Sequence, residues 1–132
     1  MSIENTESQL NRFDYSYERK SELIEIKLGF GLRMNVHFSE DGNIKIEDKL
    51  VSWNILTGVL EMSIKGAIIY NFIGTVLLGF LFLFYFFSDF EAEKLSLLVM
   101  FLIVIFWQIV FTSFYLIKAG HMKHTLIRWN EN

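Results

Sequence analysis

The chain contains no cysteine and no proline, and two of its long stretches contain no charged residue. The lack of cysteine excludes disulfides and thiolate metal sites, although it says little about the compartment. Without proline, nothing forces a kink in a long helix. The net charge is −3 and the pI is about 5.6, so the chain lacks the basic field of a nucleic-acid-binding protein. We therefore expect no nucleic-acid partner.

The uncharged stretches are the most informative part of the sequence, and they extend from Gly66 to Phe87 and from Leu95 to Ile117. At about 1.5 Å per residue, the first would form a helix of roughly 33 Å, enough to cross the hydrocarbon core of a bilayer. The acidic segment between them, residues 88–94, allows only a tight connection. A soluble protein would need a far larger domain to bury two helices that are apolar on every side. The pattern predicts a two-helix transmembrane hairpin.

Residues 12–65 precede the hairpin, and most of them alternate between apolar and polar side chains, which is typical of half-buried strands. The turn between the last two predicted strands is expected at residues 39–43 (SEDGN), where Gly42 and Asn43 tolerate positive φ. The predicted fold is an α+β membrane protein, with a small antiparallel β-rich cytoplasmic domain followed by the hairpin. The apolar positions of the alternating sets are Phe13, Tyr15 and Tyr17; Ile24, Ile26, Leu28 and Phe30; Leu32, Met34, Val36 and Phe38; Ile44 and Ile46.

Three other segments have weaker patterns. Residues 1–11 lack periodicity and are expected to be a disordered tail. Residues 48–65 fit either further strands or an amphipathic helix, and we favour a juxtamembrane helix over residues 50–64. Residues 118–132 are expected to form a cytoplasmic tail, which could continue the second membrane helix for a short distance.

The expected orientation follows from basic residues near the ends of the two membrane helices. Lys65, Lys118, Lys123 and Arg128 flank the terminal side, whereas the connection contains only Lys94. Because no signal peptide is recognisable, we expect the first apolar run to direct insertion. The predicted location is a bacterial inner (plasma) membrane, with both termini cytoplasmic and residues 88–94 outside. The expected membrane-interface anchors are Trp53, Lys65, Lys118 and Trp129.

Small and polar residues recur within the two apolar runs, and such residues allow membrane helices to approach closely and to hydrogen-bond. The two sets can contact each other across an antiparallel hairpin only if their residues lie at similar distances from the cytoplasmic side of the membrane. Thr75 lies about 13 Å and Gln108 about 15 Å from the cytoplasmic side, so they occupy similar levels. We interpret these residues as helix-packing positions, with a pore lining as the alternative. They are Ala67, Asn71, Gly74, Thr75 and Gly79 in the first run, and Gln108, Thr112 and Ala119 in or just after the second.

No sequence motif indicates catalysis. His121 and His124 are three residues apart, which is a weak metal signal without a carboxylate in register. We expect no catalytic residues, no metal site and no cofactor, and therefore no enzyme. Tyr15, Tyr17 and Phe30 could line a ligand or partner face, although aromatic residues in a small sheet more often form core or edge.

Two functional hypotheses follow from the predicted architecture. The first is a non-enzymatic integral membrane protein that self-associates through its hairpin as a homo-oligomer. In that hypothesis the cytoplasmic domain binds a protein partner or a small-molecule signal, and membrane lipid surrounds the spans. The alternative is an oligomeric pore-forming or membrane-disrupting effector of the bacterial defence or stress type, gated by its cytoplasmic domain. The second hypothesis is an analogy of architecture only.

Overall fold

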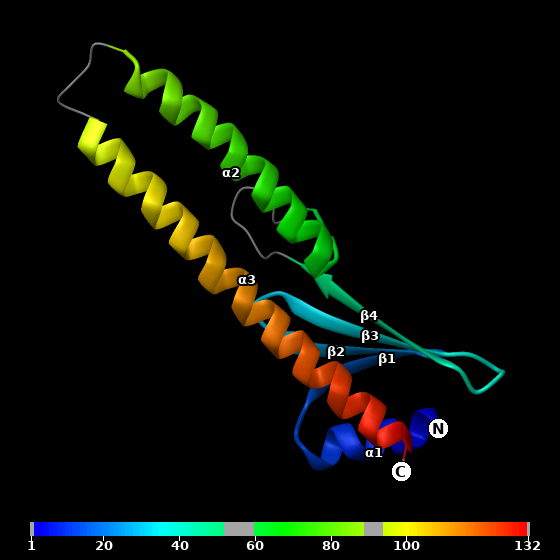
Figure 1. The fold of residues 1–132 in the computed structure, drawn as a ribbon. Helices are drawn as coiled ribbons and strands as arrows, with labels where there is room; N and C mark the ends of the chain where they lie inside the picture. Colours follow the sequence, from blue (N-terminus) through cyan, green and yellow to red (C-terminus); the bar gives the residue numbers. More distant parts are fainter. Residues whose placement is uncertain (1, 52–59, 89–93, 132) are drawn as a thin grey trace. The chain divides into compact units, whose positions relative to one another are not determined.

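The computed structural model describes residues 2–51, 60–88 and 94–131. Its elements are α1 (Ile3–Arg12), β1 (Ser16–Lys20), β2 (Leu23–Gly29), β3 (Leu32–Phe38), β4 (Ile44–Leu50), α2 (Ile64–Phe86) and α3 (Lys94–Glu131) (Figure 1). The chain divides into two compact units. A β-rich unit contains Met1–Ile64 and Tyr115–Asn132, and a hairpin unit contains Lys65–Phe114.

The β-rich unit is built on a four-stranded antiparallel meander in the order β1-β2-β3-β4. Its register confirms the predicted alternation, because Met34 pairs with Ile26 and Val36 pairs with both Ile24 and Ile46. The predicted turn at residues 39–43 joins β3 to β4, and Gly42 has the positive φ of 78° that the turn requires. The apolar face of the sheet therefore forms one side of a core.

Helix α1 corrects the prediction of a disordered tail over residues 1–11. The Ser2 side chain accepts a hydrogen bond from the backbone N–H of Asn5 and so caps the helix. Thr6 and Leu10 are buried one helical turn apart. The buried face was missed because a threonine occupies one of its central positions, which leaves little apolar periodicity to recognise.

Helix α3 is longer than the predicted second span, because it continues without interruption from Lys94 to Glu131. Its C-terminal part belongs to the β-rich unit and lies against the sheet together with α1 (Figure 1). No proline stops the helix, and its buried side chains follow a spacing of four, three and four residues. These side chains are Tyr115, Ala119, Met122 and Leu126.

The predicted helix over residues 50–64 does not have these limits. Leu50 ends β4 and forms an isolated antiparallel bridge with Met62. The Asp48 carboxylate accepts a hydrogen bond of 2.7 Å from the backbone N–H of Ile64, the first residue of α2. Strand pairing thus continues almost to the start of α2, and a carboxylate stabilises that helix N-terminus. Residues 52–59, which include Trp53, lie outside the described residues.

The first alternating set is also interrupted. Phe13 caps the C-terminus of α1 instead of beginning a strand, and Asp14 has a positive φ of 56°. The chain turns there, so β1 begins only at Ser16. Phe13 stacks on Trp129 of α3 with ring centroids 5.7 Å apart, which joins the two ends of the chain within the β-rich unit.

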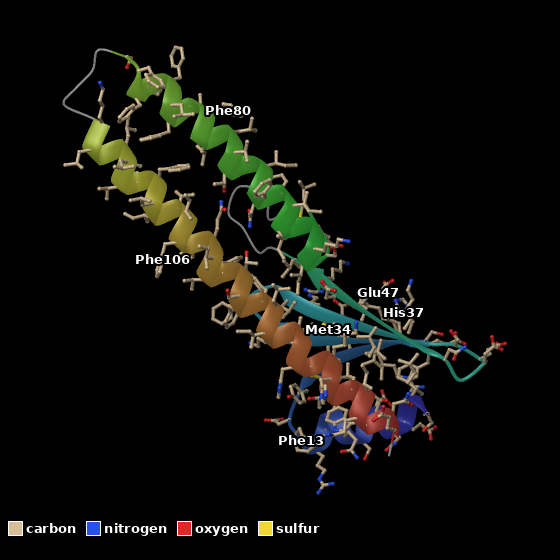
Figure 2. The ribbon with its side chains drawn as sticks, in the orientation of Figure 1. Phe13, Met34, His37, Glu47, Phe80 and Phe106 are labelled. Carbon is tan, nitrogen blue, oxygen red and sulfur yellow. The ribbon has the colours of Figure 1, made fainter. Side chains whose placement is uncertain are left out.

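The hairpin unit consists of α2 and the N-terminal part of α3. Both helices are long and apolar enough to cross a membrane. In the most apolar 18-residue stretch of α2, only 6% of the residues are buried. In the corresponding stretch of α3, none is buried. Phe80 and Phe106, which are 66% and 69% exposed, project from the outer sides of the two helices (Figure 2). Core helices of a soluble protein would be covered, whereas this surface matches a hydrocarbon solvent.

Candidate functional site

The candidate site is a groove along the hairpin, formed where α2 and α3 face each other. It has a volume of about 400 Å³ and a mainly apolar lining that includes polar side chains from both helices. The helical period explains the arrangement, because residues three or four apart lie on one face. The lining residues are Ile68, Asn71, Phe72, Thr75, Ile105, Gln108, Ile109, Thr112 and Ser113.

A hydrogen bond joins the helices inside the groove. The Thr75 hydroxyl lies 2.5 Å from Gln108 Oε1 and 2.9 Å from the backbone carbonyl of Asn71, one turn earlier. A hydroxyl carries one proton and donates only one hydrogen bond at a time. Both contacts are satisfied together when the Gln108 amide turns so that its nitrogen donates to Thr75. The two residues that the depth calculation placed at the same level are therefore hydrogen-bonded.

Further polar groups in the groove have no partner within the part of the chain that the structure describes. They are the side-chain amide of Asn71, the second polar atom of the Gln108 amide and the Thr112 hydroxyl. In hydrocarbon, an amide that lacks a hydrogen bond is costly, and lipid chains offer none. The groove therefore leaves hydrogen-bonding capacity that another polar surface could use.

Neither glycine of the predicted stripe is required for close approach inside the hairpin. A Cβ on Gly74 would have no atom within 4 Å. A Cβ on Gly79 would lie 3.6 Å from the Phe101 ring, which is ordinary van der Waals contact. Both glycines are half-buried, and only Gly79 faces a side chain of α3. Gly74 is not among the residues that line the groove, and the space at its Cβ position is open to a neighbour outside the hairpin.

The remaining predicted packing residues lie in different places. Ala67 is buried within the hairpin unit, near the start of α2. Ala119 is also buried, but it belongs to the β-rich unit together with Tyr115 and Met122. Spacing alone suggested that Ala119 continued the stripe of Gln108 and Thr112. The helix instead leaves the hairpin unit before that residue.

The predicted interface anchors have distinct surroundings. Lys65 is exposed, and Lys118 is half-buried with its Nζ 5.8 Å from the centroid of the Phe30 ring. Trp129 is half-buried against Phe13. Packing within the β-rich unit thus accounts for Trp129, and its role as a membrane anchor stays a prediction.

The predicted ligand face is divided between two parts of the β-rich unit. Tyr15 and Tyr17 are half-buried at the beginning of β1. Phe30 is exposed at the turn between β2 and β3, and its carbonyl accepts a hydrogen bond from the Tyr115 hydroxyl. Tyr115 and Phe30 are 85 residues apart in the sequence, so no local pattern could have predicted their hydrogen bond. A ligand role for these three residues stays a prediction.

The outer face of the sheet carries charged residues arranged in rows across the strands. An acidic row contains Glu18, Glu25 and Glu47, with Asn35 between the last two. The neighbouring row is basic, with Lys27, Arg33 and Lys49 in register. His37 and Glu47 lie together on this face (Figure 2), with 3.6 Å between His37 Nε2 and Glu47 Oε2. The face is therefore polar, and the charges of its acidic and basic rows offset each other.

Glu25 is the buried member of this polar face, with 6% of its side chain exposed. Arg33 Nη1 lies 2.5 Å from one carboxylate oxygen and Lys20 Nζ lies 3.1 Å from the other. The hydrogen bond from Arg33 is the main reason that the pKa of Glu25 lies below its ordinary value of 4.5, although burial opposes the shift. Because the folded pKa is the lower one, the ionised carboxylate stabilises the fold at pH values above 4.5.

We expect Glu25→Gln to lower the free energy of unfolding of the β-rich unit by about 1.5–3 kcal/mol at neutral pH, since charged hydrogen bonds are lost. The wild type should lose the same contribution as the pH falls below 4.5, so the difference between the proteins should shrink there. Thermal unfolding at neutral and acidic pH measures this. Glu18→Gln removes an exposed pair with Lys27 and should have a much smaller effect. A difference that is independent of pH would contradict this account.

We expect Thr75→Val to weaken the contact between α2 and α3 by about 1 kcal/mol, because valine preserves the shape and removes the bond to Gln108. Unfolding of the hairpin by increasing amounts of SDS, followed by circular dichroism, measures the change. Ile69→Val removes one methyl group from an exposed position of the same helix and serves as the control. Equal stability of the Thr75 variant and the wild type would show that the hydrogen bond does not hold the helices together.

Comparison with models of known protein families found no match, and comparisons with curated proteins and with solved structures found none either.

Proposed function

We propose that this chain is a non-enzymatic integral membrane protein that self-associates through the α2/α3 hairpin. The observation that carries the proposal is the groove between the helices, which presents polar groups from both of them. The open space at Gly74, which does not line the groove, is a second place where a neighbour could pack. Membrane helices associate through close packing at small residues and through hydrogen bonds between side chains, because lipid chains provide no hydrophobic driving force. A second copy supplies both kinds of contact.

The energetics favour assembly only if several contacts act together. A single hydrogen bond between membrane helices contributes about 0.6–1 kcal/mol. A symmetric interface repeats each contact, so Asn71, Gln108 and Thr112 would each act in every copy. Close packing against the open space at Gly74 would add dispersion energy. Such an interface has a defined geometry and a fixed number of copies.

The proposed role of the β-rich unit is to bind a cytoplasmic protein or a small-molecule signal. Its outer face offers rows of alternating charge, which suit recognition of a polar partner more than burial in an apolar interface. The pair of Tyr15 and Tyr17 at the edge strand β1 is the second candidate surface.

The proposed location is a bacterial inner membrane with the β-rich unit in the cytoplasm. The support is the distribution of basic residues: Lys65, Lys118, Lys123 and Arg128 on the terminal side, against Lys94 on the other. Surrounding lipid would cover the exposed apolar faces of α2 and α3.

The mass of the protein purified into lipid nanodiscs tests self-association. Native mass spectrometry or light scattering should give a discrete oligomer whose mass does not change on moderate dilution. A monomer at every concentration would reject the proposal. A broad, continuous distribution of masses would indicate non-specific clustering of apolar surfaces and would count equally against a defined interface.

The alternative function is a pore-forming or membrane-disrupting effector, and the polar lining of the groove favours it. If the groove faced the centre of an oligomer, Asn71, Gln108 and Thr112 would line the inner part of a pathway. Toward the other end of the hairpin, Phe82 stacks on Phe101 with centroids 5.5 Å apart, which would form a hydrophobic constriction. Entry of a membrane-impermeant dye on expression would support this function. Normal growth and dye exclusion, with and without stress, would count against it.

A further inference from the structure

The turn between β2 and β3 presents an exposed aromatic residue on a strained backbone. Gly29, Phe30 and Gly31 have consecutive positive φ angles of 84°, 52° and 79°. A left-handed conformation costs a non-glycine residue about 1–2 kcal/mol. The Phe30 side chain is nevertheless 77% exposed, so the core of the β-rich unit does not explain its presence. A two-residue hairpin turn takes positive φ at both central positions, so the conformation belongs to the turn, and the exposed ring becomes informative through what lies beside it.

The same turn is fixed to a defined level of α3. The Tyr115 hydroxyl donates a hydrogen bond of 2.5 Å to the Phe30 carbonyl. The Lys118 ammonium lies over the Phe30 ring and 3.8 Å from the position that a Cβ on Gly29 would take. Both partners belong to the β-rich unit, so this arrangement is internal to that unit.

That level of α3 is where the apolar run ends. The run contains no charge from Leu95 to Ile117, and Lys118 is the first charged residue after it. Ile117 is 72% exposed immediately beside Lys118. In a membrane helix, tyrosine and the first lysine lie at the boundary between acyl chains and headgroups, with the lysine amine reaching toward the phosphates. Phe30 is thus held beside the residues that mark this boundary.

We propose that the β2–β3 turn inserts Phe30 into the headgroup–acyl boundary of the bilayer that the hairpin spans. The aromatic ring covers acyl chains, and Lys118 pairs with both the ring and a lipid phosphate. The β-rich unit then rests on the membrane through this end of its sheet. The inference requires membrane insertion of α3 but not self-association, so it stands or fails separately from the proposed function.

Single cysteines in this cysteine-free chain provide the test. Phe30→Cys and Asp41→Cys are each labelled with a nitroxide, and the full-length protein is placed in vesicles of phosphatidylcholine and phosphatidylglycerol. Asp41 is the matched control because it lies in the β3–β4 turn, at the opposite end of the antiparallel sheet. The label at 30 should collide severalfold more often with oxygen than with a water-soluble nickel chelate, and the label at 41 should show the reverse. Equal accessibility at the two positions would overturn the inference.

A second measurement retains an aromatic side chain at the turn. The photoreactive residue p-benzoylphenylalanine replaces either Phe30 or Phe13, which is also exposed and lies in the same unit beside Trp129. Irradiation should attach lipid at position 30 and not at position 13. Attachment of protein instead of lipid at position 30, or of equal amounts of lipid at both positions, would also overturn the inference.

Discussion

Leucine in place of Gly74 is expected to convert the assembled protein to monomers while leaving the hairpin folded. A side chain at this position meets no atom of its own hairpin within 4 Å, so leucine fits without a clash. Leucine also favours the helix by nearly 1 kcal/mol relative to glycine, so loss of helical structure is not expected. The added side chain would instead fill the open space at position 74. A neighbouring helix could then no longer approach closely.

The mass of the Gly74→Leu protein in nanodiscs measures this effect, and circular dichroism checks that its helices are intact. Ile73→Leu is the matched control, because it places the same side chain on the adjacent, exposed face without adding volume. The control should keep the wild-type mass. If Gly74→Leu also keeps that mass, the surface around Gly74 is not a contact between copies.

Alanine in place of Met122 is expected to destabilise the β-rich unit by about 2–5 kcal/mol, which is the usual effect of truncating a buried methionine. Met122 is 2% exposed and belongs to the C-terminal part of α3. It lies in the buried series that also contains Tyr115 and Leu126. Because small domains are only marginally stable, a loss of this size would leave much of the unit unfolded.

Hydrogen exchange followed by mass spectrometry measures the Met122→Ala effect locally. Protection of the amides in β2 and β3 should fall, whereas protection in α2 should stay unchanged. Lys123→Ala alters the next residue, which is exposed, and should leave both regions as in the wild type. Unchanged protection of the sheet in the Met122 variant would mean that α3 is not part of its core.

The hairpin and most of the sheet could be predicted from the sequence because each has a strong local signal. Two uncharged runs of membrane-spanning length determine the helices. Strict alternation at Leu32, Met34, Val36 and Phe38 determines β3 and its inward face. The match in depth between Thr75 and Gln108 followed from the rise per residue, since both runs have clear charged ends.

Other features were missed because their evidence is spread over distant parts of the chain. Helix α1 buries a threonine and a single leucine, so its periodicity is too weak to recognise in isolation. The continuation of α3 was foreseen only as a short extension, although the spacing of Tyr115, Ala119, Met122 and Leu126 is that of one helix face. Contacts such as Tyr115 with Phe30 depend on how the sheet packs on the helix, which no local pattern encodes.

The most direct test of the account is whether the connection between the helices and the β-rich unit lie on opposite sides of a membrane. Cysteine is introduced separately at Ser88, which follows α2, and at Asp41, in the β3–β4 turn. Intact bacterial cells that express each variant are treated with a membrane-impermeant maleimide. The account predicts that Ser88→Cys reacts in intact cells and that Asp41→Cys reacts only after the membrane is permeabilised. Reaction of both only after permeabilisation, or of both in intact cells, would contradict a hairpin that crosses the membrane.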